Sequence, residues 1–343
     1  MSENNIQYIQ IIGTQRSGSN LLRVMLNQFS EIAAPHPPHI LQKFIPFLDH
    51  YGDLNIDSNY MQLVEDICKY IEINPVPWGD SKFNPQQIFT ASKTRSIYEV
   101  FRLVYEAYAK ANDASIWCCK SMAIINFANE LEENNLKPFY IYLYRDGRDV
   151  ACSFKKAIVG EKHIYNIARK WNKDQQLSLD LISTLDESRY YKLSYEQLIA
   201  EPEKHIKLIC NKLGIGFNPG ILDYYNSEES RNTAVAGEMW LNVKKPIIKN
   251  NTKKYKSGLT KHEILIFESE TKDTLNQLGY KTDYIVNGNR MHFSQAEISQ
   301  FNSENEHQKK LARFNALKSD LVKRKPQEMF IKSIIERNEI LFF

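Results

Sequence analysis

The stretch Ile9-Gln-Ile-Ile-Gly-Thr-Gln-Arg-Ser-Gly-Ser-Asn-Leu-Leu-Arg23 decides the fold of this chain. Its apolar start predicts a buried strand over residues 8–13, and the spacing of the apolar residues that follow predicts an amphipathic helix over 18–29. A tight loop of small residues joins the two and carries Arg16. The backbone N–H groups of such a loop and the positive end of the helix meet at one point. The stretch therefore predicts a site for an anionic group.

The loop resembles a nucleotide-binding P-loop but differs from it in its cation. Gly13 and Gly18 have the spacing of the Walker pattern G-x4-G-K-[ST], whereas Ser19 and Asn20 stand where that pattern has Lys and Ser or Thr. The cation is Arg16, which lies inside the loop. This variant looks like a loop that holds the 5′-phosphosulfate of 3′-phosphoadenosine 5′-phosphosulfate (PAPS).

Composition limits the other function classes. Residues 286–343 carry ten of the 44 Lys and Arg residues and seven of the 41 acids, which accounts for the whole formal charge of +3. The rest of the chain is neutral, so nucleic-acid binding through a broad basic face is not expected. The five cysteines form no C-x-x-C pair, so we expect neither a disulfide framework nor a zinc site.

The start of the chain indicates the compartment. Residues 1–5 lead directly into the first predicted strand, without the basic region and apolar stretch of a signal peptide. No apolar run approaches the roughly 20 residues that a membrane span needs. We therefore expect a cytoplasmic protein without a transmembrane segment.

Strands and helices alternate along the chain, which predicts an α/β fold with a parallel β-sheet flanked by helices. Residues 40–112 are mostly helical in pattern, so that 37–113 form a helical insertion between strands. Arg16, Lys120 and Arg145 each follow a predicted strand, and the carboxyl ends of parallel strands share one edge of a sheet. The further predicted strands are 31–34, 116–120, 138–144 and 190–193, and the further helices are 123–134, one from 147, 163–184, 195–199, 203–213 and 260–278.

A second anion site is predicted in Tyr144-Arg-Asp-Gly-Arg-Asp-Val-Ala-Cys-Ser153. Its strand brings Arg145 to the sheet edge and its helix brings Ser153, and a guanidinium can bind a phosphate through two hydrogen bonds. The two segments resemble two motifs of PAPS-dependent sulfotransferases. The first resembles the 5′-phosphosulfate loop, and the second resembles the 3′-phosphate motif R-D-x-R-D-V-A-x-S. A third block, 193–214, is similar to that family's Y-E-D-L…P…LG segment.

The resemblance implies a P-loop NTPase-like sulfotransferase fold. The sulfotransferase domain would span 1–285, with the insertion 37–113 over the acceptor pocket, and 286–343 would be a C-terminal helical extension. The family uses PAPS without a metal ion. The residues that the resemblance places around PAPS are Arg16, Ser17, Gly18, Ser19, Asn20, Arg145, Ser153, Tyr195 and Lys254.

The catalytic candidates follow from the same resemblance. Arg16 and Lys120 would stabilise the charge on the leaving group, since Lys120 matches a Lys that contacts the sulfuryl group in cytosolic sulfotransferases. The catalytic His of that branch is replaced by Met122. A neutral imidazole accepts a proton near pH 7, so we assign the base to a histidine of the Pro35-His-Pro-Pro-His39 loop. The candidates are His36 and His39, with a slight preference for His36.

Alternatives remain at the level of the sequence. The His-Pro loop could instead be a rigid wall of the acceptor pocket. The chain could be a nucleotide-dependent kinase with a degenerate P-loop, or a catalytically inactive module that binds PAP (3′-phosphoadenosine 5′-phosphate) or PAPS. The acceptor could be a small molecule, carbohydrate, lipid or peptide. The apolar residues Ile331, Ile334, Ile335 and 340–343 favour packing on the domain or a homodimer contact over a membrane-surface helix.

Overall fold

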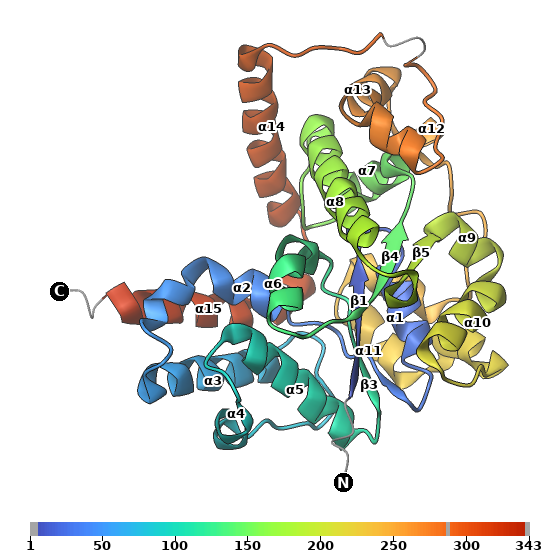
Figure 1. Cartoon of the computed structure of the whole chain (residues 1–343). Coiled ribbons are helices and arrows are strands. Elements are labelled where there is room, and N and C mark those ends of the chain that lie inside the picture. The colour runs from blue at the N-terminus through green and yellow to red at the C-terminus, as the bar shows by residue number, and fades with distance from the viewer. Residues whose placement is uncertain (1–5, 286–288, 340–343) are drawn as a thin grey trace.

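The computed structural model describes residues 6–285 and 289–339 (Figure 1). Within them one parallel sheet has the strand order β2-β3-β1-β4-β5, which confirms the predicted α/β fold. Because β1 lies between β3 and β4, the carboxyl ends of these three parallel strands lie side by side. The strand order reverses at this point, which is where α/β proteins bind ligands. The strands are β1 (Gln7–Ile12), β2 (Ile32–Ala33), β3 (Ile116–Cys119), β4 (Phe139–Tyr144) and β5 (Tyr190–Ser194).

Helices flank both faces of the sheet (Figure 1). The α-helices are α1 (Ser19–Leu26), α2 (Ile40–Phe44), α3 (Asp57–Glu72), α4 (Pro85–Ala91), α5 (Ile97–Ala111), α6 (Ala128–Glu133), α7 (Gly147–Lys156), α8 (Ile164–Thr184), α9 (Tyr195–Ala200), α10 (Pro202–Leu213), α11 (Glu228–Val235), α12 (Tyr255–Gly258), α13 (Lys261–Gln277), α14 (Gln295–Phe314) and α15 (Lys318–Glu339). The 3₁₀ helices are η1 (Ile45–Tyr51), η2 (Met122–Phe127), η3 (Glu187–Arg189), η4 (Pro219–Asn226) and η5 (Glu238–Lys244). The helix predicted over 123–134 is thus divided into a 3₁₀ segment and a short α-helix.

Alternate residues of the strands pack on opposite faces of the sheet. Ile9 and Ile11 of β1 lie in a buried cluster with α1 and α10, whereas Ile12 lies in a second cluster with α7, α8 and α13. Tyr8 belongs to a third cluster with the insertion helices. The central strands β3, β1 and β4 are buried on both faces over most of their length, as parallel strands usually are, whereas the edge strand β5 is buried only at its carboxyl end.

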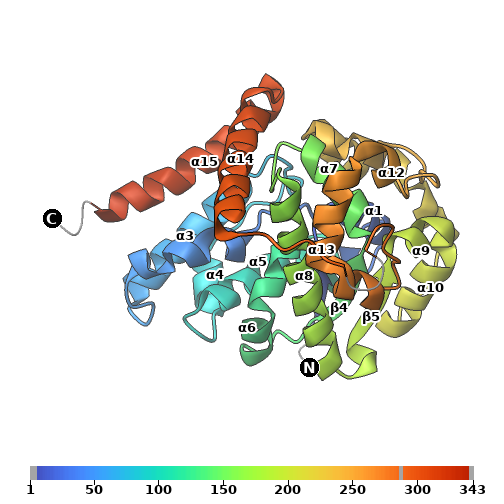
Figure 2. The same ribbon diagram turned by 90° about the horizontal axis from the view of Figure 1, so that it is seen from above.

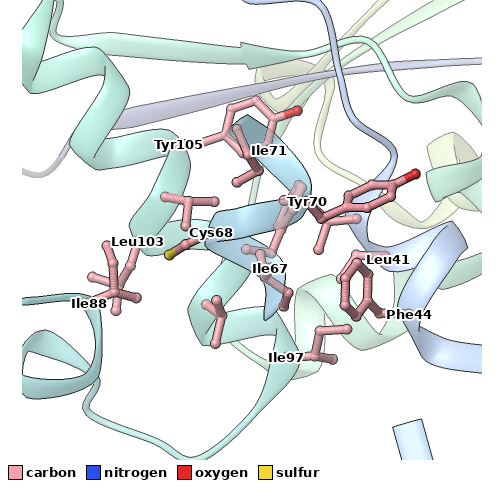
Figure 3. Close-up of a cluster of buried hydrophobic side chains, with 14 of the residues drawn as sticks. Leu41, Phe44, Ile67, Cys68, Tyr70, Ile71, Ile88, Ile97, Leu103 and Tyr105 are labelled. Carbon is pink, nitrogen blue, oxygen red and sulfur yellow. The ribbon is translucent and has the colours of Figure 1, made fainter. Parts of the chain in front are cut away.

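The insertion between β2 and β3 has its own apolar centre. Figure 3 shows side chains of α2, α3, α4 and α5 meeting there, among them Phe44, Ile67 and Tyr105. Trp117 of β3 belongs to the same cluster, so the insertion packs directly on the sheet.

The C-terminal helices also pack on the domain. α14 lies beside α8, as Figures 1 and 2 show from two directions, and α15 contacts η1. Ile334 of α15 is buried in the cluster of the insertion, and Gln327 donates a hydrogen bond of 3.0 Å to the carbonyl of Tyr70. The apolar residues 340–343 lie outside the described residues. In the described part of the chain no helix has the length and apolar character needed to cross a bilayer.

Candidate functional site

The loop between β1 and α1 is held by two glycines that no other residue could replace without strain. Gly13 has a φ of 119°, and a Cβ there would lie 2.2 Å from the carbonyl oxygen of Leu143. Gly18 has a φ of 89°, and its Cβ would lie 2.4 Å from the ring of Tyr195. The loop therefore touches β4 on one side and α9 on the other, and α1 begins directly after it at Ser19.

Arg16 connects this loop to α7. Its Nε donates a hydrogen bond of 2.9 Å to Ser153 Oγ, and its Nη2 donates one of 3.4 Å to the carbonyl of Met239. Burial and the charge of Arg145 lower the pKa of Arg16 to about 10. The two positive charges thus act on each other, and among the described residues only Arg145 of the two has an ion pair, with Asp149 at 3.5 Å, so an anion between them would be stabilised.

Arg145 follows β4 and is fixed from several sides. Its Nη1 donates 3.3 Å to the carbonyl of Arg16, its Nη2 donates 2.6 Å to the carbonyl of Asn251, and the same Nη2 is 3.5 Å from Asp149 Oδ2. The guanidinium lies 4.4 Å above the ring of Tyr195. Its Nε is buried without a hydrogen-bond partner among the described residues. A donor held in this way is ready for a ligand oxygen.

Tyr195 forms a flat wall beside Arg145. Ser194 and Gln197 cap the start of α9, which fixes the position of the first residue of the helix. The Tyr195 hydroxyl accepts a hydrogen bond of 2.7 Å from Asn251 Nδ2. Asn251 thus contacts both Arg145 and Tyr195, yet the sequence pattern gives no signal for it, because it comes from a loop far along the chain.

These residues line a cavity of about 770 Å³. The volume suits a nucleotide-sized ligand. Of the residues predicted for PAPS, only Ser17 does not line the cavity; it is buried, and its hydroxyl has no hydrogen-bond partner within the described chain. The predicted residues that line the cavity are Arg16, Gly18, Ser19, Asn20, Arg145, Ser153, Tyr195 and Lys254.

Three predicted catalytic residues are not among those that line this cavity: Lys120, His36 and His39. Lys120 follows β3 and is only 7% exposed. Burial, followed by the charge of Arg23, lowers its pKa to about 7. No hydrogen bond or ion pair to its ammonium is found in residues 6–285 and 289–339. Lys120 therefore changes charge near neutral pH and gains from an anionic neighbour.

The two histidines differ in their contacts. His39 Nδ1 lies 2.8 Å from Ser121 Oγ, whereas neither ring nitrogen of His36 has a hydrogen-bond partner in the described part of the chain. The ring of His36 lies edge-on to that of Trp240, with the ring centres 4.6 Å apart. Trp240 lines the cavity, so it connects His36 to it.

Burial keeps both imidazoles neutral. It lowers the pKa of His36 well below its usual value and that of His39 to about 3, and in both cases the charge of Lys120 adds to the effect. A neutral ring can accept a proton, although the lowered pKa makes each of these two imidazoles a weaker base than a solvent-exposed histidine.

Arg23 is a further buried cation that the sequence analysis did not assign to the site. It is paired with Glu229 and donates 2.7 Å to the carbonyl of Ala34 and 2.6 Å to Thr233 Oγ1. These bonds join α1 to α11 and to the residues just before the His-Pro loop. The sequence gives no signal that Arg23 links α1 to α11, because nothing in it indicates that α11 lies opposite the first helix.

The described residues contain no group of three or more His, Cys, Asp or Glu side chains that could hold a metal ion. The fold and the cavity define a P-loop-like α/β protein with a cationic site at the carboxyl edge of its sheet. The sequence profile of the Sulfotransferase family matches residues 9–219, and this chain belongs to that family.

Solved structures agree with this fold. The sulfotransferase domain from the curacin biosynthetic pathway is similar, with a TM-score of 0.55 and 23% identity, over 80% of this chain and 98% of that domain. The sulfotransferase domain from the Synechococcus PCC 7002 olefin synthase has a TM-score of 0.51 and 20% identity, over 78% of this chain and 96% of that domain. No curated protein sequence is a significant match. The predicted sulfotransferase fold is therefore confirmed.

Proposed function

We propose that this protein transfers a sulfuryl group from PAPS to a hydroxyl or amine of an acceptor, and that it acts in the cytoplasm. The arrangement of Arg16, Arg145 and Ser153 around one cavity carries the proposal. Two guanidiniums and a hydroxyl at the end of a P-loop-like segment fit a nucleotide that bears phosphates on two sides of its ribose.

Two polar groups that lack hydrogen-bond partners among the described residues support a nucleotide in the donor site. Arg145 Nε and Ser17 Oγ are buried without partners among the described residues, and both would gain one in a phosphate or sulfate oxygen. We assign the 3′-phosphate to Arg145 and Ser153, and the 5′-phosphosulfate to residues 16–20. The ring of Tyr195 would lie near the adenine, and Lys254 would cover the nucleotide.

PAPS would supply the sulfuryl group that is transferred. Arg16 and Lys120 would stabilise the negative charge that grows on the bridging oxygen as that group leaves. With a pKa of about 7, Lys120 is partly neutral before the anion binds, and an anion beside it favours the charged form. No metal ion is required in this scheme, because the two cations supply the charge.

His36 is our first candidate for the base and His39 the second. His36 keeps both ring nitrogens free of partners in the described chain, and the Trp240 ring beside it lines the cavity. In His39, Nδ1 already faces Ser121, so only Nε2 could accept the proton of the acceptor. The backbone of the loop is held in place, since Trp78 Nε1 donates 2.7 Å to the carbonyl of His36.

Two measurements test the proposal. Calorimetry should show that PAP binds to the protein without magnesium and more tightly than ATP with magnesium; the reverse order, with turnover of ATP, would favour the kinase. Incubation with ³⁵S-labelled PAPS and a set of hydroxyl and amine acceptors should then give labelled product that EDTA does not reduce. Binding of PAP with no transfer to any acceptor class would favour the inactive module.

The base assignment has its own test. If His36→Ala and His39→Ala both keep full turnover, neither histidine is the base. If only His36→Ala loses turnover while PAP affinity stays the same, His36 has that role.

A further inference from the structure

The C-terminal helix α15 contributes to the wall of the cavity. Asp320 lines the cavity, and its Oδ2 accepts a hydrogen bond of 3.2 Å from the backbone N–H of Glu238. One helical turn later, the guanidinium of Arg324 lies 5.3 Å from the ring centre of Trp240. Trp240 also lines the cavity and contacts His36. A segment outside the matched family region thus reaches the candidate base.

Arg324 has no anionic partner at this place. Its Nε and Nη2 are buried and make no hydrogen bond within the described chain, and none of the ion pairs among the described residues includes it. Asp320 and Glu328, one turn away on either side, act on it only at longer range, and burial lowers its pKa despite them. Arg324 is half-buried, but buried N–H groups without an acceptor are costly, so a binding anion that accepts from Nε and Nη2 would remove that cost.

The charged and titratable groups that act on His36, Arg324 among them, are all basic. Both ring nitrogens of His36 lack partners among the described residues, and Lys120 has no ion pair there. Burial lowers the pKa of His36 most, and the charges of Lys120, Arg23, His39 and Arg324 lower it further. Of Lys120, Arg23 and Arg324, only Arg23 forms an ion pair with a carboxylate of the described residues, that of Glu229. In the proposed reaction the transferred sulfuryl group is the anion beside Lys120, so Arg324 would still need an anion of its own.

We propose that Arg324 binds an oxyanion of the acceptor, so that the acceptor carries a carboxylate or a phosphate besides the hydroxyl or amine that is sulfated. Nε–H and Nη2–H form the side of a guanidinium that binds two oxygens of one oxyanion at once. The acceptor would lie along Trp240, with its anion at α15 and its nucleophile near His36. This inference rests on the proposed function, because it concerns the acceptor side of the same site.

The test uses the full chain saturated with PAP, so that the donor site is filled. Benzoate, phenyl phosphate and the neutral benzamide are titrated into it, with calorimetry as the readout. We expect at least one of the two anions to bind, and benzamide to bind at least tenfold more weakly. Arg324→Gln should weaken the anion at least tenfold and leave PAP affinity unchanged. The control is Lys325→Gln, which removes an exposed charge from the same helix.

The comparison of the anions distinguishes a carboxylate site from a phosphate site. Equal binding of the anions and benzamide, or unchanged anion binding in Arg324→Gln, overturns the inference. If Arg324 has only a structural role, its replacement should lower the melting temperature. We expect Arg324→Gln to melt at the same temperature or higher, because a cation with two buried, unpaired N–H groups is removed. If PAP fails to bind the wild type, the proposed function fails, and the difference in anion binding between wild type and Arg324→Gln still reports on this cluster.

Discussion

Arg16 Nε donates a hydrogen bond of 2.9 Å to Ser153 Oγ, which joins the loop after β1 to α7 across 137 residues of sequence. The serine hydroxyl accepts this bond and keeps its own proton for another acceptor. Ser153 can therefore donate to a phosphate oxygen without leaving Arg16. The residues predicted for the two ends of the nucleotide are thus already linked before any ligand binds.

Arg145 should decide whether the protein recognises a 3′-phosphate. We expect Arg145→Gln to weaken PAP binding by about 10- to 100-fold, since a hydrogen bond to a charged group contributes roughly 1.5–3 kcal/mol. AMP, which lacks the 3′-phosphate, should bind wild type and variant with similar affinity. Calorimetric titration of both nucleotides into both proteins measures this difference.

Arg189 is a suitable control for Arg145. It also carries an ion pair, 2.8 Å from Glu132, but lies away from the cavity at the opposite end of β5. Arg189→Gln should leave PAP affinity within twofold of wild type. An equal loss for PAP and AMP in Arg145→Gln would contradict the assignment of Arg145 to the 3′-phosphate.

Gly18 should be intolerant of any side chain. Gly18→Ala places a Cβ 2.4 Å from the ring of Tyr195 and imposes a φ of 89° on an L-residue, so we expect a loss of about 1–3 kcal/mol in unfolding free energy. The ring of Tyr195 would have to move from Arg145, which should also weaken PAP binding. Gly216→Ala is the control, because nothing lies within 4 Å of its Cβ and its φ is not in the left-handed region. Urea unfolding and PAP titration of both variants decide the matter.

The meeting of Arg16 and Arg145 at one cavity could be predicted from the sequence, because their positions follow local rules. Arg16 and Arg145 each end a strand, and parallel strands bring such ends to one edge. The R-D-G-R-D motif nevertheless contains two arginines of different use. Arg148 is buried in ion pairs with Asp146 and Glu268, at 2.8 and 2.6 Å, and so holds α7 to α13. Spacing alone does not distinguish it from Arg145.

The contacts of Trp240 with Arg324 and His36 could not be predicted, because they form only through tertiary packing. Trp240 lies in a 3₁₀ helix and Arg324 in the C-terminal extension, and neither belongs to a repeated or spaced motif. The contact of His36 with Trp240, which lines the cavity, likewise joins distant segments of the chain. A sequence pattern records neighbours along the chain, whereas these contacts join segments that are far apart.

Lys120 should make PAPS binding depend on pH near neutrality. With its pKa at about 7, it is mostly charged at pH 6 and mostly neutral at pH 8. An anion that requires the charged form then binds more weakly as pH rises, by up to about tenfold per pH unit above 7. We expect the KM for PAPS to rise between pH 7 and 8, and Lys120→Gln to have a higher KM that no longer changes. Lys110→Gln, at an exposed lysine of α5, should follow the wild type. A flat profile in the wild type would contradict the prediction that the charge of Lys120 changes between pH 7 and 8 and acts on PAPS.

Stability in acid should depend on His36 and His39. At pH 7 both imidazoles are neutral in the folded and the unfolded chain, so neither changes the unfolding free energy. Because the folded-state pKa of each is lowered, mainly by burial, the unfolded chain alone takes up protons as pH falls through about 6.5. Each histidine should then cost about 1.4 kcal/mol per pH unit, and for His39 the loss continues to about pH 3. Urea unfolding at pH 7.5 and 5.0 measures the loss, and His39→Asn should reduce it while the exposed control His262→Asn does not. The same loss in His39→Asn and wild type would mean that His39 is protonated in the folded protein and is therefore not a buried neutral base.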